Sequence, residues 1–228
     1  MRPKISGQDL STLKNSFVLS INGYRLNLMN RVFRASGLPS PEAIAGEERG
    51  KVGCCLGHKK IIDTASARGL PWCMSFEDDA YPCLRIRRKL KTLVLPDADV
   101  YLLGYSTTNC KFGNGEEWAI MKPGDRCCGT HAILIRGTAY DVMSSTLGRI
   151  YHADDVFRIM SNGSTGLSVA VKRSPLFIQY NQGDLSALHG HRGYIFNGDH
   201  GLPPKGFPHL GALLQRMQDK NHEHRPHR

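Results

Sequence analysis

The stretch PWCMSFEDDA, from Pro71 to Ala80, joins an apolar run to three consecutive carboxylates. A short apolar run bounded by proline and turn residues predicts a buried strand. On such a strand Glu77 and Asp79 would point to one face and Asp78 to the other. Because ligands in α/β sheets bind beyond the carboxyl ends of the strands, these acids are expected at a binding site.

Three adjacent acids at a sheet edge require a neutralising positive charge. Carboxylate oxygens suit Mg²⁺ or Mn²⁺, and such ions in proteins commonly also hold a substrate phosphate. We therefore interpret Glu77 and Asp79 as ligands of a metal that binds a nucleotide diphosphate. A solvated acidic turn is the alternative that this stretch alone leaves open.

Composition favours a globular domain with an anionic partner. The chain has 228 residues, 40% of them hydrophobic, and a formal net charge of +10. This charge favours a nucleotide, a phosphorylated glycan, a membrane surface or nucleic acid as the partner.

The seven cysteines do not form a small disulfide scaffold. Without a signal-like or membrane-spanning apolar run, a cytoplasmic location is expected, with possible peripheral membrane contact through the basic helix near Arg85–Lys91. The alternative for this helix is a solvated outer face.

Hydrophobic periodicity alternates between strand and helix patterns, which predicts an α/β fold. One domain is expected over residues 16–180. It would be preceded by a flexible arm at 1–15 and followed by an extension at 181–217 and a disordered tail at 218–228. Strands are expected at 16–21, 71–80, 99–104, 129–135, 168–171 and 176–179. Helices are expected at 26–35, 54–68, 84–95 and 139–147 and after Asp155, and loops at 40–53 and 105–128.

A second carboxylate pair, Asp154 and Asp155, precedes a short helical stretch. Group transfer from a nucleoside diphosphate needs a cation for the leaving group and a base for the attacking hydroxyl. Either acid of this pair could be that base. The alternative is that one of them caps the following helix.

The motif Cys-Cys-x-x-His occurs twice, at Cys54-Cys55 with His58 and at Cys127-Cys128 with His131. Two such units could build a Cys₂His₂ zinc centre. Both cysteine pairs also suit small buried positions, which is the alternative interpretation. His189 and His191 could line a site or lie in a glycine-rich turn.

An ordered set of motifs resembles glycosyltransferase family 25, which includes lipopolysaccharide glycosyltransferases and procollagen galactosyltransferases. The resemblance covers about Ser16–Gln179. Its motifs are INGYR at 21–25, AIAG at 43–46, GKVGCCLGH at 50–58, GL at 69–70, FEDD at 76–79, DVYLLG at 99–104, the strand and helix at 130–139 and ADDVF at 153–157.

The resemblance implies a GT-A-like nucleotide-sugar-binding fold with a mixed central sheet flanked by helices. It also implies a UDP-sugar donor, usually UDP-galactose, a Mn²⁺-type cation, inversion at the anomeric carbon and a glycan acceptor of lipopolysaccharide or glycoprotein type. Carried over by position, Glu77 would meet the ribose side of the nucleotide and Asp79 the metal. Asp154 falls on the family's downstream aspartate. The remaining nucleotide-side residues would be Asn22, Arg25, His58 and Asp78.

Four positions depart from the family pattern: Gly23, Met29, Gly57 and Ile62. They motivate a second hypothesis, a catalytically silent relative that binds a nucleotide or glycan. A third hypothesis, a basic nucleic-acid-binding protein, rests on the net charge and the Arg85–Lys91 helix. Because the chain lacks a DNA- or RNA-binding signature, no specific nucleic acid is expected.

Overall fold

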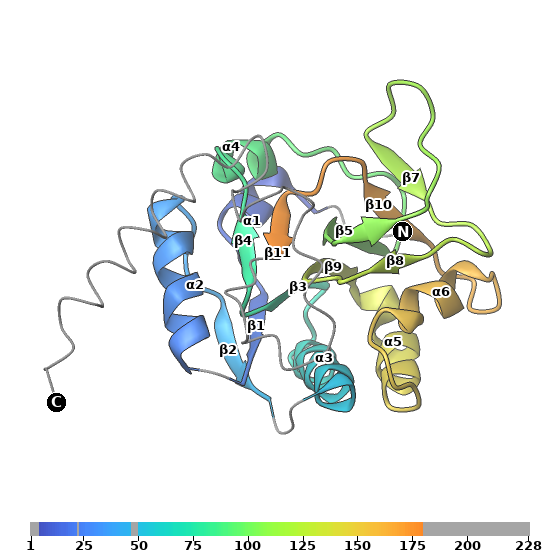
Figure 1. Ribbon diagram of the computed structural model, residues 1–228, viewed down its shortest axis with the longest axis horizontal. Helices are drawn as coiled ribbons and strands as arrows, with labels where there is room; N and C mark the ends of the chain where they lie inside the picture. The colour runs from blue at the N-terminus through green and yellow to red at the C-terminus, as the bar shows by residue number, and fades with distance from the viewer. Residues whose placement is uncertain (1–4, 22, 47–49, 180–228) are drawn as a thin grey trace, which may run out of the picture.

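The computed structural model describes residues 5–21, 23–46 and 50–179, which form a mixed sheet covered by helices on both faces (Figure 1). Nine of the described strands belong to this sheet. Its main order is β2 (Glu42–Ala45), β1 (Ser16–Ser20), β3 (Trp72–Glu77), β9 (Ala132–Arg136), β5 (Val100–Gly104), β10 (Val169–Lys172) and β7 (Trp118–Ile120), with β11 (Phe177–Gln179) pairing with β5 and with β4 (Ala80–Pro82).

Strand directions explain why the sheet is mixed. Strand β1 runs parallel to both β2 and β3. Strand β9 is inserted antiparallel between β3 and β5, and β5 is parallel to β10. The expected α/β architecture, with a mixed central sheet flanked by helices, is therefore confirmed.

Alternation along β3 divides the interior into two hydrophobic cores. Trp72, Met74 and Phe76 belong to the first core, whereas Cys73 belongs to the second, because successive side chains on a strand point to opposite faces. The first core includes side chains of α1 (Gly7–Ser11), α2 (Gly23–Ala35) and α4 (Ile86–Lys91). The second includes side chains of α3 (Lys51–Ala67), the 3₁₀ turn η1 (Gly137–Ala139), α5 (Tyr140–Leu147) and α6 (Asp155–Ser161).

The chain near its beginning differs from the flexible arm expected at residues 1–15. From Ile5 onward it is folded, because α1 contacts α4 and buries Leu10 completely. Ser6 caps this short helix by accepting a hydrogen bond from the backbone N–H of Asp9. Residues 5–15 are therefore part of the domain.

Two expected loops contain short strands. The first, 40–53, includes the edge strand β2, which has a polar or exposed side chain at most positions and so lacks a strong strand pattern. The second, 105–128, includes β7 and the two-stranded sheet formed by β6 (Thr107–Thr108) and β8 (Cys127–Cys128). The C-terminal extension, the tail, His189 and His191 lie outside the described residues. Within the described part, no helix is both long and apolar enough to cross a bilayer.

Candidate functional site

The predicted acids lie where β1 and β3 end. These parallel strands bring their carboxyl ends to the same edge of the sheet, and the antiparallel β9 begins there. The carbonyl of His131, just before β9, accepts a hydrogen bond from the backbone N–H of Glu77 at 3.0 Å. Side chains from three strands and from the beginnings of α2 and α3 can therefore meet at this edge.

Arg25, in the first turns of α2, bridges two of the acids. Its Nη2 atom lies 2.7 Å from Oδ1 of Asp78 and 2.6 Å from Oδ2 of Asp79. The expected alternation of the three acids is wrong, because β3 ends at Glu77 and the next two residues form a turn. Burial by itself would lower the pKa of Arg25, but Asp79 and Asp78 raise it above its ordinary value.

The buried carboxylate of Asp79 uses only one of its two oxygens in hydrogen bonds and ion pairs among the described residues. Its Oδ2 atom also accepts a hydrogen bond from Nε2 of Gln179 at 3.1 Å, whereas Oδ1 is buried without a hydrogen-bond partner in the described part of the chain. Burial and then the charge of Glu77 raise the pKa of Asp79 to about 7, against the opposing effect of Arg25. Burial also raises the pKa of Asp78, which accepts a hydrogen bond from Oγ of Ser20 at 2.8 Å.

The acidic turn, formed by Asp78 and Asp79 directly after β3, therefore fits a divalent cation. A buried oxygen without a partner is rare in folded proteins, since its desolvation is not compensated. Arg25 supplies one positive charge for Asp78 and Asp79, with Glu77 close enough to raise the pKa of Asp79. Carboxylate oxygens in this environment are ligands that Mg²⁺ and Mn²⁺ prefer.

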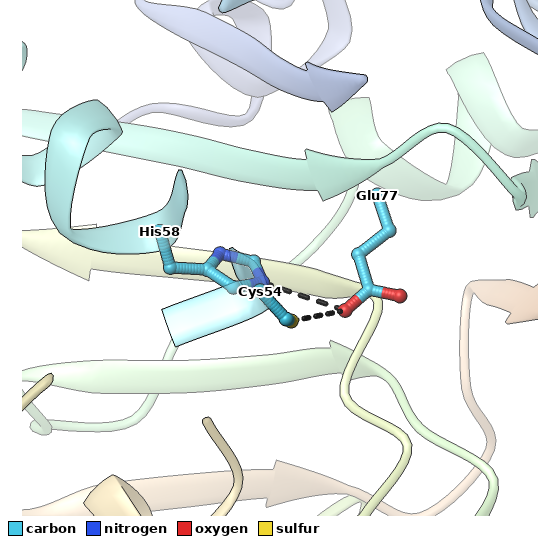
Figure 2. A group of neighbouring side chains, drawn as sticks. All are labelled: Cys54, His58 and Glu77. Atoms are coloured by element: carbon cyan, nitrogen blue, oxygen red, sulfur yellow. Dashed lines mark hydrogen bonds and ion pairs between the residues drawn. The ribbon is translucent and has the colours of Figure 1, made fainter. Parts of the chain in front are cut away.

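Glu77 has separate partners on α3 (Figure 2). His58 Nε2 and Cys54 Sγ each lie 3.4 Å from its Oε1 atom, and His58 Nδ1 lies 2.9 Å from Oγ of Ser75. Burial alone would raise the pKa of Glu77, but the hydrogen bond and charge of His58 lower it below its usual value. Burial and the charge of Glu77 raise the pKa of the Cys54 thiol well above its ordinary value.

The Cys₂His₂ zinc alternative is not supported. Among the described residues, Cys54 joins His58 and Glu77, and no residue of the second Cys-Cys-x-x-His motif takes part in a metal-capable group. In that motif, the two ring nitrogens of His131 lie 2.7 Å and 3.1 Å from backbone carbonyl oxygens. Since Cys127 is buried, it matches the small-hydrophobe interpretation.

The second acid pair lies near the same end of the sheet. Asp154 occupies the N-cap position of α6, but its side chain makes no capping hydrogen bond there. Its carboxylate instead accepts hydrogen bonds from the backbone N–H groups of Gly129 and Thr130 and from the Thr130 hydroxyl. After burial and Glu77, the charge of Asp154 also contributes to the raised pKa of Cys54 on α3.

Asp155 is more accessible than its neighbour. It pairs with Arg158 at 3.2 Å, and 40% of its side chain is exposed. Both acids line a cavity of about 320 Å³ together with Arg126, Cys127, Cys128 and Arg158. This cavity could receive a substrate group close to two carboxylates.

The structure thus groups most of the predicted residues in two adjacent clusters, Arg25 with Asp78 and Asp79, and His58 with Glu77. Asn22 lies outside the described residues. Sequence reasoning missed the supporting contacts of Ser20, Ser75 and Gln179. A polar residue at the carboxyl end of an expected strand was the available signal for Ser20 and Gln179.

No known protein-family profile matches the sequence, and no curated protein matches it. Solved structures with a similar arrangement are remote. A glycosyltransferase involved in glycosylation of the major capsid of PBCV-1 is 7% identical, with 73% of this chain and 92% of that chain covered and a TM-score of 0.46.

Two further solved structures have similar coverage. A Drosophila β-1,4-galactosyltransferase 7 mutant, in complex with manganese, UDP-Gal and xylobiose, is 11% identical. The similarity covers 78% of this chain and 82% of that one, with a TM-score of 0.41. A nucleoside-diphosphate-sugar pyrophosphorylase from Vibrio cholerae is 16% identical, with 73% and 75% covered and a TM-score of 0.40.

Proposed function

We propose that this chain is a metal-dependent, inverting glycosyltransferase with a GT-A-like fold. It would transfer a sugar, with galactose as the first donor to test, from a UDP-sugar to a hydroxyl of a glycan acceptor. The observation that carries the proposal is Oδ1 of Asp79, which is buried without a hydrogen-bond partner in the described chain, while Oδ2 of the same carboxylate pairs with Arg25 at the sheet edge. The motif resemblance to glycosyltransferase family 25 supports the choice of donor.

The acidic turn would hold the donor. Asp79 and Glu77 are the proposed ligands of Mn²⁺ or Mg²⁺, which when bound would neutralise charge on the leaving diphosphate. Arg25 keeps both aspartates of the turn in place through its two ion pairs. On the resemblance, the nucleotide would be contacted by Asn22, Arg25, His58, Glu77 and Asp78.

The transfer itself would be a single displacement. The acceptor hydroxyl forms a bond to the anomeric carbon while the bond from that carbon to the diphosphate oxygen breaks on the opposite side. The proton of the hydroxyl passes to a carboxylate of the second pair. Asp154 is the candidate from the resemblance, although its oxygens already accept hydrogen bonds from the protein. Asp155 lines the same cavity with a more exposed carboxylate.

The test compares Asp79→Ala and Asp79→Asn with the unaltered chain. Released UDP is measured with UDP-galactose and UDP-glucose during a Mn²⁺ titration, with and without glycan acceptors. We expect both variants to lose about 100-fold or more of the activity and to lose the response to Mn²⁺. Asp141→Asn, an exposed position on α5, is the matched control and should behave as the unaltered chain does.

Two outcomes would redirect the assignment. Unchanged turnover and metal response in Asp79→Ala would remove Asp79 from the site. Binding of UDP by calorimetry without turnover on any donor or acceptor would favour the catalytically silent relative that the departures at Gly23, Met29, Gly57 and Ile62 suggest.

We also propose peripheral membrane contact through α4, in a cytoplasmic setting. Ile86 and Leu90 are buried, whereas the basic residues of the helix are exposed and the apolar Leu84 and Val94 beside it are 41% and 77% exposed. Cations beside exposed apolar groups suit an anionic lipid surface. Vesicles containing anionic lipid should bind the chain, and the double variant R87E/R88E should lose that binding. Equal binding to neutral vesicles would contradict the proposal.

A further inference from the structure

The contact between α3 and the end of β3 gathers three chemically different metal-binding groups. Cys54 and His58 lie four residues apart on α3, so that both face the strand, and Glu77 is the last residue of β3 (Figure 2). Their thiol, imidazole and carboxylate ligand atoms all lie within 4.8 Å of one another. No other group of three or more such side chains is found among the described residues.

The spacing matches a coordination shell. Ligands around a tetrahedral Zn²⁺ ion stand about 3.3–3.7 Å apart, because the bonds to the metal are about 2.0–2.3 Å long. Cys54 Sγ and His58 Nε2 each lie 3.4 Å from Oε1 of Glu77. Two of the three separations in the group therefore agree with those expected around a single ion.

The orientation of His58 is already set. The residue is 3% exposed, and its Nδ1 atom lies 2.9 Å from Oγ of Ser75, so Nε2 faces the group. A hydrogen bond to the second ring nitrogen is how proteins usually orient a metal-binding histidine. The other oxygen of Glu77 points away from Cys54 and His58 (Figure 2).

We propose that Cys54, His58 and Glu77 form a second cation site, specific for a soft divalent metal of the zinc class. Thiolate and imidazole ligands favour Zn²⁺ or Co²⁺ over Mg²⁺, which prefers oxygen. Cys54 would bind as the thiolate and release its proton to solvent. Three protein ligands leave the fourth position to water or a substrate group. The site goes beyond the proposed glycosyltransferase function, with which it shares Glu77 and His58 but not Cys54.

The experiment titrates Co²⁺ into the metal-free full chain in the absence of any nucleotide. A sulfur-to-cobalt charge-transfer absorption in the near ultraviolet reports a thiolate ligand, so histidines elsewhere in the chain cannot produce it. We expect the absorption to saturate at one equivalent and to be absent in Cys54→Ser. His58→Gln and Glu77→Gln should weaken binding about tenfold or more, and Ser75→Ala by about tenfold. Cys128→Ser, which removes an exposed cysteine outside the group, should keep the absorption.

A second measurement covers the case in which Cys54→Ser does not fold. Zn²⁺ should slow alkylation of Cys54 in the unaltered chain, read by peptide mass spectrometry, and leave that of Cys128 unchanged. The proposal is overturned if the unaltered chain shows neither the absorption nor the protection, or if Cys128→Ser removes them. Because no sugar nucleotide is present, failure here is distinct from failure of the Asp79 test, which uses turnover and Mn²⁺.

Discussion

The carboxylate of Asp154 accepts a hydrogen bond at 3.1 Å from the backbone N–H of Thr130, a residue 24 positions earlier in the chain. The next residue, His131, accepts a hydrogen bond through its carbonyl from the N–H of Glu77. Asp154 is thus connected to Glu77, at the end of β3, through two consecutive residues of the segment that leads into β9. Asp154 therefore fixes this segment, whatever further part it takes in the reaction.

Asp154→Asn should destabilise the fold. The amide cannot accept hydrogen bonds at both of its former oxygens, so a backbone N–H of Gly129 or Thr130 would face another donor. The expected loss is about 1–3 kcal/mol of unfolding free energy, measured by urea denaturation. Asp155→Asn, which breaks only the exposed pair with Arg158, should change stability by less than about 0.5 kcal/mol. Equal stability of the two variants would contradict the structural role of Asp154.

The same pair of variants separates the two candidate bases. If Asp155 accepts the proton, Asp155→Asn loses turnover while keeping its stability and its affinity for UDP. If Asp154 does so, Asp155→Asn keeps most of its turnover. UDP release and urea denaturation on the same preparations distinguish these outcomes.

Arg25→Ala should cost about 2 kcal/mol, because it removes the cation shared by Asp78 and Asp79. This is less than the roughly 3–5 kcal/mol of a fully buried broken pair, since Asp79, with its pKa of about 7, can take up a proton. Urea denaturation at neutral pH measures the loss, and UDP affinity should fall with it. Arg31→Ala, at an exposed position of the same helix, is the control. A comparable loss in the control would show that the effect belongs to the helix.

Gly129→Ala tests how closely the segment before β9 approaches its neighbour. The φ of Gly129 is +65°, and an added Cβ would lie 2.4 Å from Oγ of Ser106. Gly124 also has a positive φ, +91°, but an added Cβ there would meet nothing within 4 Å. Both alanines should cost about 1 kcal/mol of backbone strain, and Gly129→Ala should cost about 1–3 kcal/mol more from the contact. Thermal unfolding of both variants measures the difference, and similar losses would mean that Ser106 simply moves aside.

Asp63 should make a pH-dependent contribution to stability. It accepts hydrogen bonds from Lys59 on its own helix and from Ser144 on α5. Burial alone would raise its pKa, but these two hydrogen bonds lower it below the usual value. The stabilisation is therefore present above the unfolded-state pKa of about 3.9 and is lost as the pH falls through the lower folded-state pKa.

Asp63→Asn should accordingly lower the unfolding free energy at pH 7 by less than about 1 kcal/mol, because the pair is partly exposed and screened by solvent. As the pH falls toward 3, the difference between the variant and the unaltered chain should shrink. Urea denaturation at both pH values makes the comparison, with Asp141→Asn on α5 as the control. A difference that is the same at pH 3 and pH 7 would exclude an ionic origin.

The local sequence pattern was sufficient to predict most of the longer helices and strands. The periodicity predicts α3 and α5 to within a few residues, and the apolar run before the acids predicts β3, although the strand ends at Glu77 instead of continuing to Ala80. Its alternation also accounts for Glu77 facing α3, since Ser75 and Cys73 share that face. These features depend on residues close together in the chain, where side-chain direction repeats every two or 3.6 residues. The edge strand β2 and the short helix α1 escaped prediction because their few residues carry little periodic signal.

The partners of the acids depended on the tertiary structure. Arg25 reaches Asp79 from α2, Gln179 reaches it from β11, 100 residues later, and Cys54 meets Glu77 across the interface between α3 and β3. These contacts require the order of the strands, in which β9 enters antiparallel between β3 and β5. Strand order is set by packing of the whole domain, whereas periodicity records only which face of each element is buried. The sequence by itself therefore placed the carboxylates at the end of a strand, and only the folded chain decided which charges and ligands surround them.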